Sequence, residues 1–441
     1  MGVLSCPQDS LNLLMDIARL YGWFTQSSGV STDTRNIAPD SLFFALKGPS
    51  FNANELAGEA LAKGALFAVV DEARYAIDDR FFLVKDSLEA LQMLARYHRS
   101  QLSIPVIGLT GSNGKTTSKE LVYGVLSKKF RTQATQGNLN NHIGVPLTLL
   151  QIHKSTEIAI VEMGANHVGE IAHLSSLALP THGFITNIGR AHIGTFGGFE
   201  NIIRGKSELY QHLITSQGTV FINSQNEILM NMAKRFKDPI FYPGKDDYYA
   251  CELIHADPLV TIKAANGEII RSQLVGAYNF ENIAVALCIG KYFGVPEADA
   301  NAAIREYFPS NMRSQILTRG TNTVILDAYN ANPSSMEAAI RNLARMNAAQ
   351  KLAIVGDMYE LEEDTEMEHR KTGELLASLK IPALFCGKHM KVAAEVISGS
   401  HYFETVDLLK KYLTQNPVSH ATILVKASRG MKLEGVVEVI Q

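Results

Sequence analysis

The stretch GLTGSNGKTTSKE at positions 108–120 constrains the fold most, because it joins an apolar run, a glycine-rich turn and a helix-forming segment. The run at 106–109 is typical of a strand. The glycines let backbone amides face an anion at the positive end of the following helix. A strand, loop and helix in this order belong to an α/β protein with a parallel sheet. The sequence therefore predicts a phosphate site inside an α/β domain.

The loop departs from the strict phosphate-loop pattern, in which Gly, any four residues and Gly-Lys-Ser/Thr follow one another. Counted back from Gly114, the first position holds Leu109, and glycines stand at 108 and 111 instead. The order of strand, turn, Lys-Thr and helix is kept, so a turn that only begins a helix is the weaker interpretation. We expect Lys115 to reach the β- and γ-phosphates of a nucleotide and Thr116 to bind Mg²⁺. The other candidates for phosphate contacts are Gly111, Ser112, Asn113, Gly114 and Thr117.

Strand-like and helix-like segments alternate along the chain and divide it into three predicted domains. The first, at 1–100, is a mixed α/β domain with short apolar runs at 41–46 and 65–70, short helical stretches, and a helix at 87–100. The second, at 101–312, is a phosphate-loop ATPase-like domain. Its runs at 158–161 and 183–186 have the continuous apolar character of strands buried on both faces. A polar stretch at 237–272 predicts antiparallel strands, and 279–293 predicts a helix.

The third predicted domain, at 313–441, repeats the α/β pattern. Strands at 323–330, 351–357, 382–387 and 421–428, each followed by a helix, predict a Rossmann-like, doubly wound sheet. Ligands of such sheets bind at the carboxyl ends of the strands. Those ends carry Asp327, Asn330, Asp357, Lys426 and Ser428.

Composition narrows the class of protein. The formal net charge of −3 gives no basic footprint for nucleic acid, so an anion site has to be local. The four cysteines include no CxxC pair and suggest neither a disulfide framework nor a zinc site. No apolar run approaches the ~18–20 residues that span a bilayer, and the N-terminus has no signal-peptide pattern. We expect a soluble, cytoplasmic, monomeric protein.

Candidate metal-binding residues follow the loop. Glu162 ends a buried strand-like run, a place where acids beside a phosphate loop often serve the metal. His192 follows the next strand, and a second Mg²⁺ site made from Glu162, His192 and one further anion would explain it. Lys206 lies in the helical stretch NIIRGKSELYQHL, where a solvated helix lysine is the simplest interpretation.

These motifs resemble a known family. TGSNGKTTSKEL, GNLNNHIGVPLTLL, VEMGANHVGEI, TNIGRAHIGTFGG and KSELY follow the order and spacing of the Mur ligases, the ATP-dependent amide-forming enzymes of bacterial cell-wall synthesis. The resemblance covers nearly the whole chain. It implies ATP and two Mg²⁺ ions, and a Lys206 that CO₂ carboxylates at N6. Carboxylated Lys206, His192 and Glu162 would then hold one metal and Thr116 the other.

The resemblance also assigns substrate contacts. Asn279 and Asn282 match the motif that meets adenine, Arg313 a phosphate contact and Asp327 the residue that holds the ribose. The residues that match the UDP-sugar contacts are Ser31, Thr34 and Arg35. The residues that match the loop next to the reacting carboxylate are Asn140, Asn141 and His142. Departures from the family pattern are Tyr278 in place of His, Asn52-Ala53-Asn54 in place of Asp-Gly-His, and Asn223-Ser224-Gln225, which lacks an acid.

Stretches 327–340, 355–370 and 31–48 resemble the family member that adds D-Ala-D-Ala to UDP-MurNAc-tripeptide through an acyl phosphate. The C-terminal domain would supply the dipeptide pocket, with Asn330, Asn332, Ser334 and Ser335. Lys115, Lys206, His192 and Arg313 would carry the catalysis. Two alternatives compete: a sister ligase or folylpolyglutamate-type synthase that adds a single amino acid, and a nucleotide-dependent switch without synthesis. The third residue of the tripeptide stays open between diaminopimelate and lysine.

Overall fold

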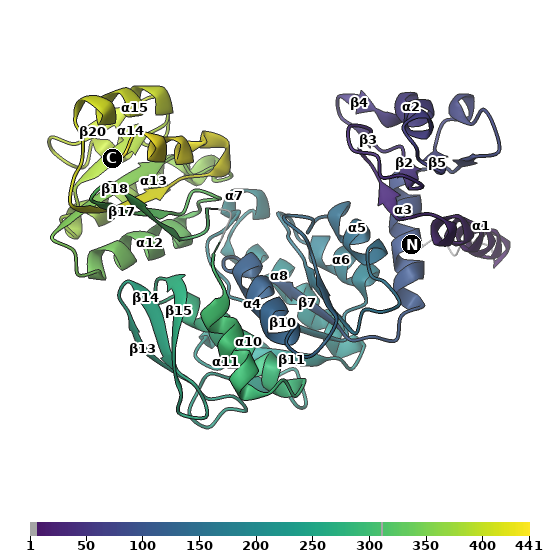
Figure 1. Cartoon of the computed structure of the whole chain (residues 1–441), viewed down its shortest axis with the longest axis horizontal. Coiled ribbons are helices and arrows are strands. Elements are labelled where there is room, and N and C mark those ends of the chain that lie inside the picture. The colour runs from purple at the N-terminus through teal and green to yellow at the C-terminus, as the bar shows by residue number, and fades with distance from the viewer. Residues whose placement is uncertain (1–6, 310–311) are drawn as a thin grey trace.

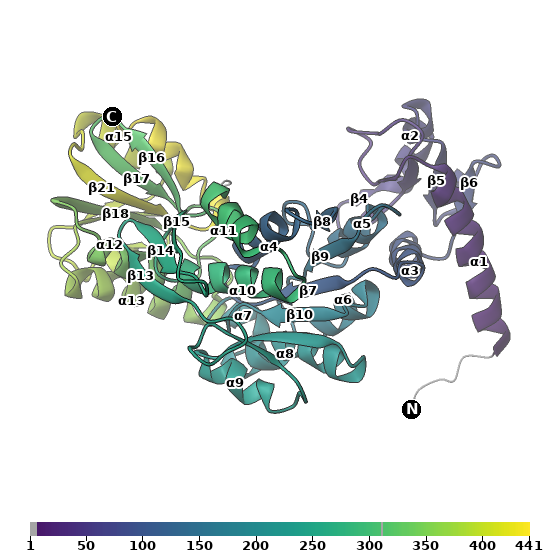
Figure 2. The same cartoon turned by 60° about the horizontal axis from the view of Figure 1, so that its bottom comes forward.

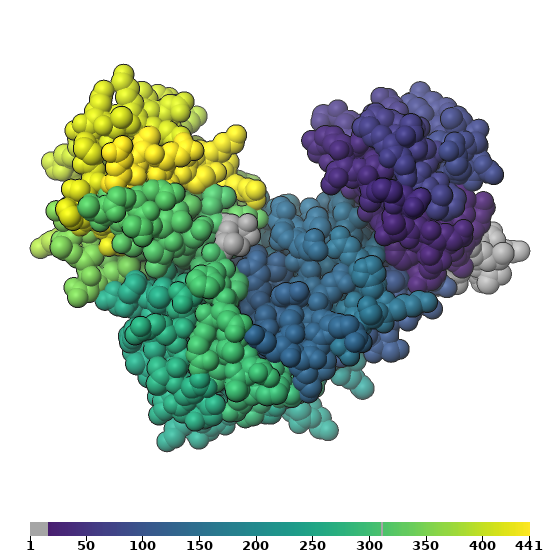
Figure 3. Space-filling view, viewed as in Figure 1, coloured from purple at the N-terminus to yellow at the C-terminus, as the bar shows by residue number. Residues whose placement is uncertain are grey.

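The computed structural model describes residues 7–309 and 312–441. We describe an N-terminal part (7–100), a central part (101–309) and a C-terminal part (312–441). The N-terminal and C-terminal parts stand apart on opposite sides of the central part (Figure 1). The space-filling view shows an open hollow between them (Figure 3). Within the described ranges, no helix is both long enough and apolar enough to cross a bilayer.

The N-terminal part packs helices against a small parallel sheet. Its elements are α1 (Pro7–Gln26), β1 (Val30–Ser31), β2 (Leu42–Phe44), β3 (Lys47–Gly48), β4 (Phe51–Asn52), η1 (Ala53–Leu56), α2 (Ala57–Ala62), β5 (Phe67–Val70), η2 (Ala73–Tyr75), β6 (Phe81–Leu83) and α3 (Ser87–Ser100). The sheet order is β1-β2-β5-β6, and β2 is fully buried, as its apolar run predicts. Helix α3 has the predicted bounds and begins where Asp86 accepts a hydrogen bond from the Glu89 amide at 2.8 Å.

Helix α1 differs from the sequence interpretation, which expected only short helices in this region. It has 20 residues. It packs on α3 through Phe24 and His98, whose ring centres lie 5.2 Å apart. Phe24 therefore gains part of its burial from α3, a segment more than sixty positions away, which explains why local pattern did not reveal the length of α1.

The central part is built on a six-stranded parallel sheet. Its strands are β7 (Val106–Thr110), β8 (Thr132–Ala134), β9 (Ile158–Glu162), β10 (His182–Ile185), β11 (Thr219–Asn223) and β12 (Ile240–Tyr242). Their order is β12-β11-β10-β7-β9-β8. Strand β9 is buried along its whole length and β10 is buried after its first residue, which confirms the prediction from their apolar runs. The phosphate-loop strand β7 thus lies inside the sheet, between β10 and β9.

Helices cover both faces of this sheet. They are α4 (Lys115–Leu126), α5 (Gly144–Leu150), α6 (Glu170–Ala178), α7 (Ile193–Phe196), α8 (Phe199–Thr215), α9 (Glu227–Ala233), α10 (Asn279–Tyr292) and α11 (Glu297–Glu306). Helices α4 and α10 lie on one face, and α6 and α8 on the other (Figure 2). The predicted antiparallel strands are present as β13 (Glu252–Ala256), β14 (Leu259–Lys263) and β15 (Ile269–Val275), which form a separate sheet.

The C-terminal part holds a second six-stranded sheet. Its strands are β16 (Gln315–Arg319), β17 (Asn322–Leu326), β18 (Gln350–Gly356), β19 (Ala383–Cys386), β20 (His401–Phe403) and β21 (Ala421–Lys426), in the order β16-β17-β21-β18-β19-β20. All pair in parallel except β16, which is antiparallel to β17. The four predicted strands are confirmed as β17, β18, β19 and β21. The two edge strands were not predicted, because half-exposed edges lack a continuous apolar run.

Helices α12 (Pro333–Arg345), α13 (Thr365–Ser378) and α14 (Lys391–Ala394) follow β17, β18 and β19 as predicted, and α15 (Val406–Gln415) precedes β21. Short 3₁₀ turns also occur, namely η3 (Glu362–Asp364), η4 (Arg429–Met431) and η5 (Leu433–Glu438). The helix predicted after β21 is present in 3₁₀ form, as η4 and η5. The carboxyl ends of β17, β18 and β21 face the phosphate loop, and this arrangement makes the site.

Candidate functional site

A cavity of about 910 Å³ lies between the central and C-terminal parts. The sequence-predicted residues that line it are Ser112, Asn113, Gly114, Lys115, Thr116, Thr117, Asn140, Asn141, His142, Glu162, His192, Asn279, Asn282, Arg313, Asp327, Asn330, Asn332, Ser334 and Ser335. Residues from seven separate stretches of the chain are thus brought to one place. The other candidates lie outside its lining, and they are Gly111, Lys206, Ser31, Thr34 and Arg35.

The end of strand β10 holds the phosphate loop in shape. The Asn187 side chain accepts a hydrogen bond from the Asn113 amide at 3.0 Å, and its main-chain carbonyl accepts one from the Ser112 amide at 3.0 Å. The Thr186 hydroxyl donates to the Asn113 carbonyl at 2.6 Å. This supporting role of Asn187 was not predicted. Its signal in the sequence is a polar amide directly after a buried strand.

Two positions of the phosphate loop require glycine, because side chains from other segments lie where a Cβ atom would be. Gly111 has φ +146°, and a Cβ there would collide with the Thr186 side chain. Gly114 has φ +77°, and a Cβ there would lie 2.6 Å from Asn282 Oδ1. Glycine tolerates both the left-handed backbone and the missing space. The loop can therefore turn tightly enough to aim the first turn of α4 into the cavity.

Lys115 begins α4 and folds back over the loop, where its ammonium donates to the Gly111 carbonyl at 2.8 Å. Burial lowers the pKa of Lys115, the Glu162 carboxylate opposes that shift, and Arg313 adds to it. A phosphate bound at the loop would supply a negative partner and favour the charged amine. The site is therefore preorganised for an anion.

Glu162, at the end of β9, is buried, with 1% of its surface exposed. One carboxylate oxygen accepts hydrogen bonds from Asn140 Nδ2 at 2.8 Å and from the Thr116 hydroxyl at 3.3 Å. The other oxygen is buried and has no hydrogen-bond partner among the described residues. A carboxylate oxygen beside a hydroxyl is a donor set that suits Mg²⁺. These residues therefore fit a metal ion, although the described ranges contain no group of three or more His, Cys, Asp or Glu placed to hold one.

His192 meets the C-terminal part. Its Nδ1 lies 2.5 Å from Oε2 of Glu360, in the loop after β18. The hydrogen bond from His192 lowers the pKa of Glu360. His192 and Glu360 both have a left-handed backbone, with φ of 57° and 65°. Such a conformation costs non-glycine residues of order 1–3 kcal/mol and concentrates at functional sites. Glu360 was not predicted, because one acid in the run ELEEDTEMEH has no distinguishing pattern.

Lys206, on α8, is buried, with 1% of its surface exposed. Its amine lies 5.3 Å from the centre of the Phe196 ring and donates to the Ala165 carbonyl at 3.3 Å. Burial first, and then the charge of Lys115, lower the pKa of Lys206 well below its ordinary range. The interpretation of Lys206 as a solvated helix lysine is therefore wrong. Ala165 lines the cavity, so Lys206 lies directly behind its wall.

The predicted adenine motif packs against α4. Asn282 donates to Asn279 Oδ1 at 2.8 Å and accepts from the Ser118 hydroxyl at 2.8 Å, while Asn279 donates to the Val275 carbonyl at 2.8 Å. Tyr278, the departure from the family pattern, bonds through its hydroxyl to the Ser314 hydroxyl at 2.8 Å. The tyrosine thereby joins the central part to the C-terminal part.

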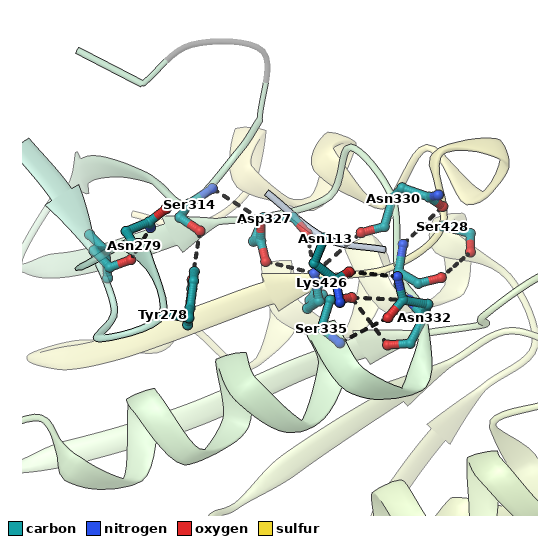
Figure 4. A network of polar contacts seen from close by, with 12 residues as sticks. Asn113, Tyr278, Asn279, Ser314, Asp327, Asn330, Asn332, Ser335, Lys426 and Ser428 are labelled. Carbon is teal, nitrogen blue, oxygen red and sulfur yellow. Dashed lines mark hydrogen bonds and ion pairs between the residues drawn. The ribbon is translucent and has the colours of Figure 1, made fainter. Parts of the chain in front are cut away.

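The predicted ribose residue belongs to a polar network, which Figure 4 shows from close by. Asp327 accepts from the Ser314 amide at 3.0 Å and pairs with the Lys426 ammonium at 2.6 Å. The Lys426 ammonium also donates to the Asn330 carbonyl at 3.2 Å. The Arg313 guanidinium stacks on the Tyr329 ring at 3.7 Å. Two cations and an acid are therefore held at the same edge of the C-terminal sheet.

The predicted dipeptide residues form the start of α12. Asn332 and Ser335 make a capping box, in which the Ser335 amide donates to Asn332 Oδ1 at 2.9 Å. Asn332 Nδ2 donates to Asn113 Oδ1 of the phosphate loop at 2.8 Å, and the Ser334 hydroxyl accepts from the Arg190 amide at 2.7 Å. The candidate acceptor pocket and the phosphate loop are thus in direct contact.

The predicted sugar-binding residues lie in the N-terminal part, outside the cavity lining. Ser31 and Thr34 are buried, and Arg35 is an exposed residue that pairs with Asp33 at 2.6 Å. The Asn52-Ala53-Asn54 departure has a structural role, because Asn54 Nδ2 donates to Asp71 Oδ1 at 2.7 Å. The N-terminal part, which carries these residues, lies across the hollow of Figure 3 from the C-terminal part.

The Lys426–Asp327 pair gives a first prediction. Lys426 is 1% exposed, so Lys426→Met should leave the Asp327 carboxylate without its cation and cost about 3–5 kcal/mol of unfolding free energy. Urea denaturation followed by circular dichroism measures the loss. The double variant Lys426→Met/Asp327→Asn is the control, and it should recover most of the lost stability. Equal stability of Lys426→Met and the wild-type chain would contradict a structural role for the pair.

Comparison with known proteins decides the family. Residues 109–290 match the Mur ligase middle domain, and residues 312–429 match the Mur ligase, glutamate ligase domain. The chain is 35% identical over 427 residues to UDP-N-acetylmuramoyl-tripeptide--D-alanyl-D-alanine ligase of Bacillus subtilis, covering 93% of this chain and 92% of the relative. The chain belongs to the Mur ligase family. The enzyme of the same name from Escherichia coli is 33% identical and covers 98% of both chains.

Solved structures agree with this Mur ligase assignment. A crystal structure of MurF from Acinetobacter baumannii superposes with a TM-score of 0.83 at 31% identity, covering 93% of this chain and 92% of that one. MurF from Thermotoga maritima in complex with ADP gives 0.82 at 27% identity, covering 95% and 97%. The three-domain α/β fold class predicted from the sequence is therefore confirmed.

Proposed function

We propose that the chain is an ATP-dependent ligase that joins D-Ala-D-Ala to UDP-MurNAc-tripeptide, giving UDP-MurNAc-pentapeptide, ADP and phosphate. The observation that carries this function is the similarity to ligases of that name over more than nine-tenths of the chain. The cavity between phosphate loop and C-terminal sheet supports it, since one chain supplies residues for all three substrates. A single copy therefore suffices for activity, and the ATP it uses places it in the cytoplasm.

The chemistry follows from the weakness of a carboxylate as an acylating agent. The terminal carboxylate of the tripeptide takes the γ-phosphoryl group of ATP, which releases ADP and leaves an acyl phosphate. The amine of D-Ala-D-Ala, after losing a proton, then forms a bond to the acyl carbon, and the carbon–oxygen bond to phosphate breaks. Phosphoryl transfer depends mainly on positioning and charge neutralisation. Lys115, Arg313 and the amides of 111–117 would neutralise and orient the phosphates.

Thr116 would hold one Mg²⁺ ion, and Glu162, His192 and carboxylated Lys206 would hold the other. The unpaired, buried oxygen of Glu162 supports this assignment. Bound Mg²⁺ would neutralise phosphate charge during the transfer. Asn140, which donates to Glu162 at 2.8 Å, would keep that carboxylate aimed at the ion.

Lys206 would be carboxylated at N6. Its neutral amine attacks CO₂, a carbon–nitrogen bond forms, and one proton leaves, so the cation becomes an anion that can serve the second metal. The lowered pKa of Lys206 supports this reaction, since only the unprotonated amine is a nucleophile. Its place behind the wall that carries Ala165, close to the charge of Lys115, also favours a negative over a positive group.

The remaining residues would bind the substrates. Asn279 and Asn282 would meet the adenine and Asp327 the ribose. Asn140, Asn141 and His142 would border the reacting carboxylate, and Asn330, Asn332, Ser334 and Ser335 the dipeptide. Ser31, Thr34 and Arg35 would bind the UDP-sugar across the hollow. The separation of the N-terminal part from the cavity implies that the parts close before chemistry.

One assay tests the function. The chain is incubated with ATP and Mg²⁺, with UDP-MurNAc-tripeptide and D-Ala-D-Ala added together or singly, and ADP release is measured. Sustained release is expected only when both co-substrates are present. Release with a free amino acid in place of the dipeptide would indicate a sister ligase. Release that ignores both co-substrates would indicate a plain nucleotide hydrolase and contradict the proposed function.

A further inference from the structure

The acceptor dipeptide brings a positive charge into a cavity that already holds cations. Its amine is an ammonium in water, and it has to reach the acyl phosphate beside Lys115 and Arg313, both of which line the cavity. An ammonium in such a place needs a carboxylate, because like charges and partial burial both oppose it. The candidate dipeptide residues at the start of α12 are amides and hydroxyls, and none of them carries a charge.

The carboxylates that line the cavity are Glu162, Glu170, Asp327 and Glu360. Three of them are engaged elsewhere. Glu162 is bonded by Thr116 and Asn140, and Glu170 accepts from the Asn166 amide at 2.7 Å within its own loop. Asp327 is neutralised by Lys426 at 2.6 Å. Among the described residues, Glu360 has a single ion-pair partner, the His192 ring, and 46% of its side-chain surface is exposed.

The position of Glu360 suits the incoming amine. It follows β18, at the carboxyl edge of the C-terminal sheet where α12 also begins, so it borders the candidate dipeptide pocket. Glu360 and Lys115 line the same cavity, and the charge of Lys115 adds to the lowering of the pKa of Glu360 by His192. The left-handed backbone of Glu360, φ 65°, holds the carboxylate there at an energetic cost.

We propose that the Glu360 carboxylate binds the ammonium of the acceptor dipeptide, and that His192 holds this carboxylate in place until the dipeptide arrives. This inference rests on the proposed function. It assigns Glu360 a role in acceptor specificity: the site selects acceptors with a free, positively charged amino terminus. Deamino analogues of the dipeptide lose this interaction and keep the rest of the pocket.

The test compares two ligands in wild-type enzyme and in Glu360→Gln. The KM for D-Ala-D-Ala reports binding with the ammonium. The inhibition constant of propanoyl-D-alanine, measured against D-Ala-D-Ala, reports the same pocket without it. Glu360→Gln should raise the KM about tenfold or more, as expected for a lost hydrogen bond to a charged group, and change the inhibition constant less than about threefold. The KM for ATP should stay near its wild-type value, which also shows that the variant is folded.

Three outcomes would overturn the inference. Both constants rising equally would mean that Glu360 shapes the pocket without recognising charge. Both constants staying unchanged, with or without a fall in kcat, would assign Glu360 to the support of His192 alone. If the wild-type enzyme releases no ADP when both co-substrates are present, the proposed function itself is contradicted. This result is obtained before any variant is made, so it is distinguished from a failure of the inference about Glu360.

Two further variants sharpen the test. Glu362→Gln is the matched control, because Glu362 shares the loop, the acidic side chain and a left-handed backbone, φ 48°, yet does not line the cavity. Its constants should stay at wild-type values. Glu360→Asn replaces Glu360→Gln if the latter does not fold, because asparagine adopts the left-handed conformation readily. It should show the same selective rise in the KM for D-Ala-D-Ala.

Discussion

Replacing Lys115 with alanine is expected to lower turnover about 10²–10³-fold or more, by analogy with the loss of one preorganised donor at a developing charge. Lys115 is the cation at the first turn of α4, and its ammonium reaches back to the Gly111 carbonyl at 2.8 Å, over the loop where phosphates would sit. The backbone amides of the loop remain in the variant, so the affinity for the nucleotide should fall by a smaller factor than the turnover.

Steady-state ADP release with both co-substrates measures the effect of Lys115→Ala, and calorimetric titration with ADP measures binding. Lys128→Ala is the control, because Lys128 follows the same helix and pairs with the exposed Glu306 at 2.6 Å. A surface pair of this kind contributes about 0–1 kcal/mol, so turnover should stay within about twofold. Near-normal turnover of Lys115→Ala would refute its role at the phosphates.

The sequence predicts the strand, loop and helix around Lys115 correctly, because the pattern that specifies them is local. Loop, lysine and helix lie within thirteen consecutive positions, 108–120, and a glycine pattern reports the backbone that they need. Glu162 and Asp327 could be named for a similar reason, since each follows a buried apolar strand. The strand ends of a parallel sheet meet at one edge, so local pattern also predicts their neighbourhood.

The residues that sequence reasoning missed act through tertiary contacts. Glu360 was missed because its partner His192 is 168 positions away, at the start of α7, and no local pattern marks one acid among its acidic neighbours. The burial of Lys206 could not be predicted from local sequence either. Its helix is amphipathic and the residue was read as solvated, yet the structure buries it against Phe196 and Ala165. Burial, which decides its pKa, is a property of the packed chain.

Removing the Lys206 amine is expected to lower turnover about 10²-fold or more, the scale of one lost charged group at a transition state. If the carbamate serves a metal, its loss leaves the second ion short of an anion. Lys206→Ala opens space at a buried position, and short carboxylic acids such as acetate or propionate should enter it and restore part of the rate. Lys206→Met fills the same space with apolar atoms, so it should be inactive and resist rescue.

The carbamate has a direct readout that does not depend on activity. Wild-type enzyme equilibrated with ¹³C-bicarbonate should show a carbamate carbon signal in its NMR spectrum, and both Lys206 variants should lack that signal. Because carboxylation needs the neutral amine and releases a proton, lowering the pH through the depressed pKa of Lys206 should remove the signal from the wild-type enzyme. Rescue of Lys206→Met by the same acids would contradict the carbamate, since its pocket is filled. Full activity of Lys206→Ala without any added acid would contradict it as well.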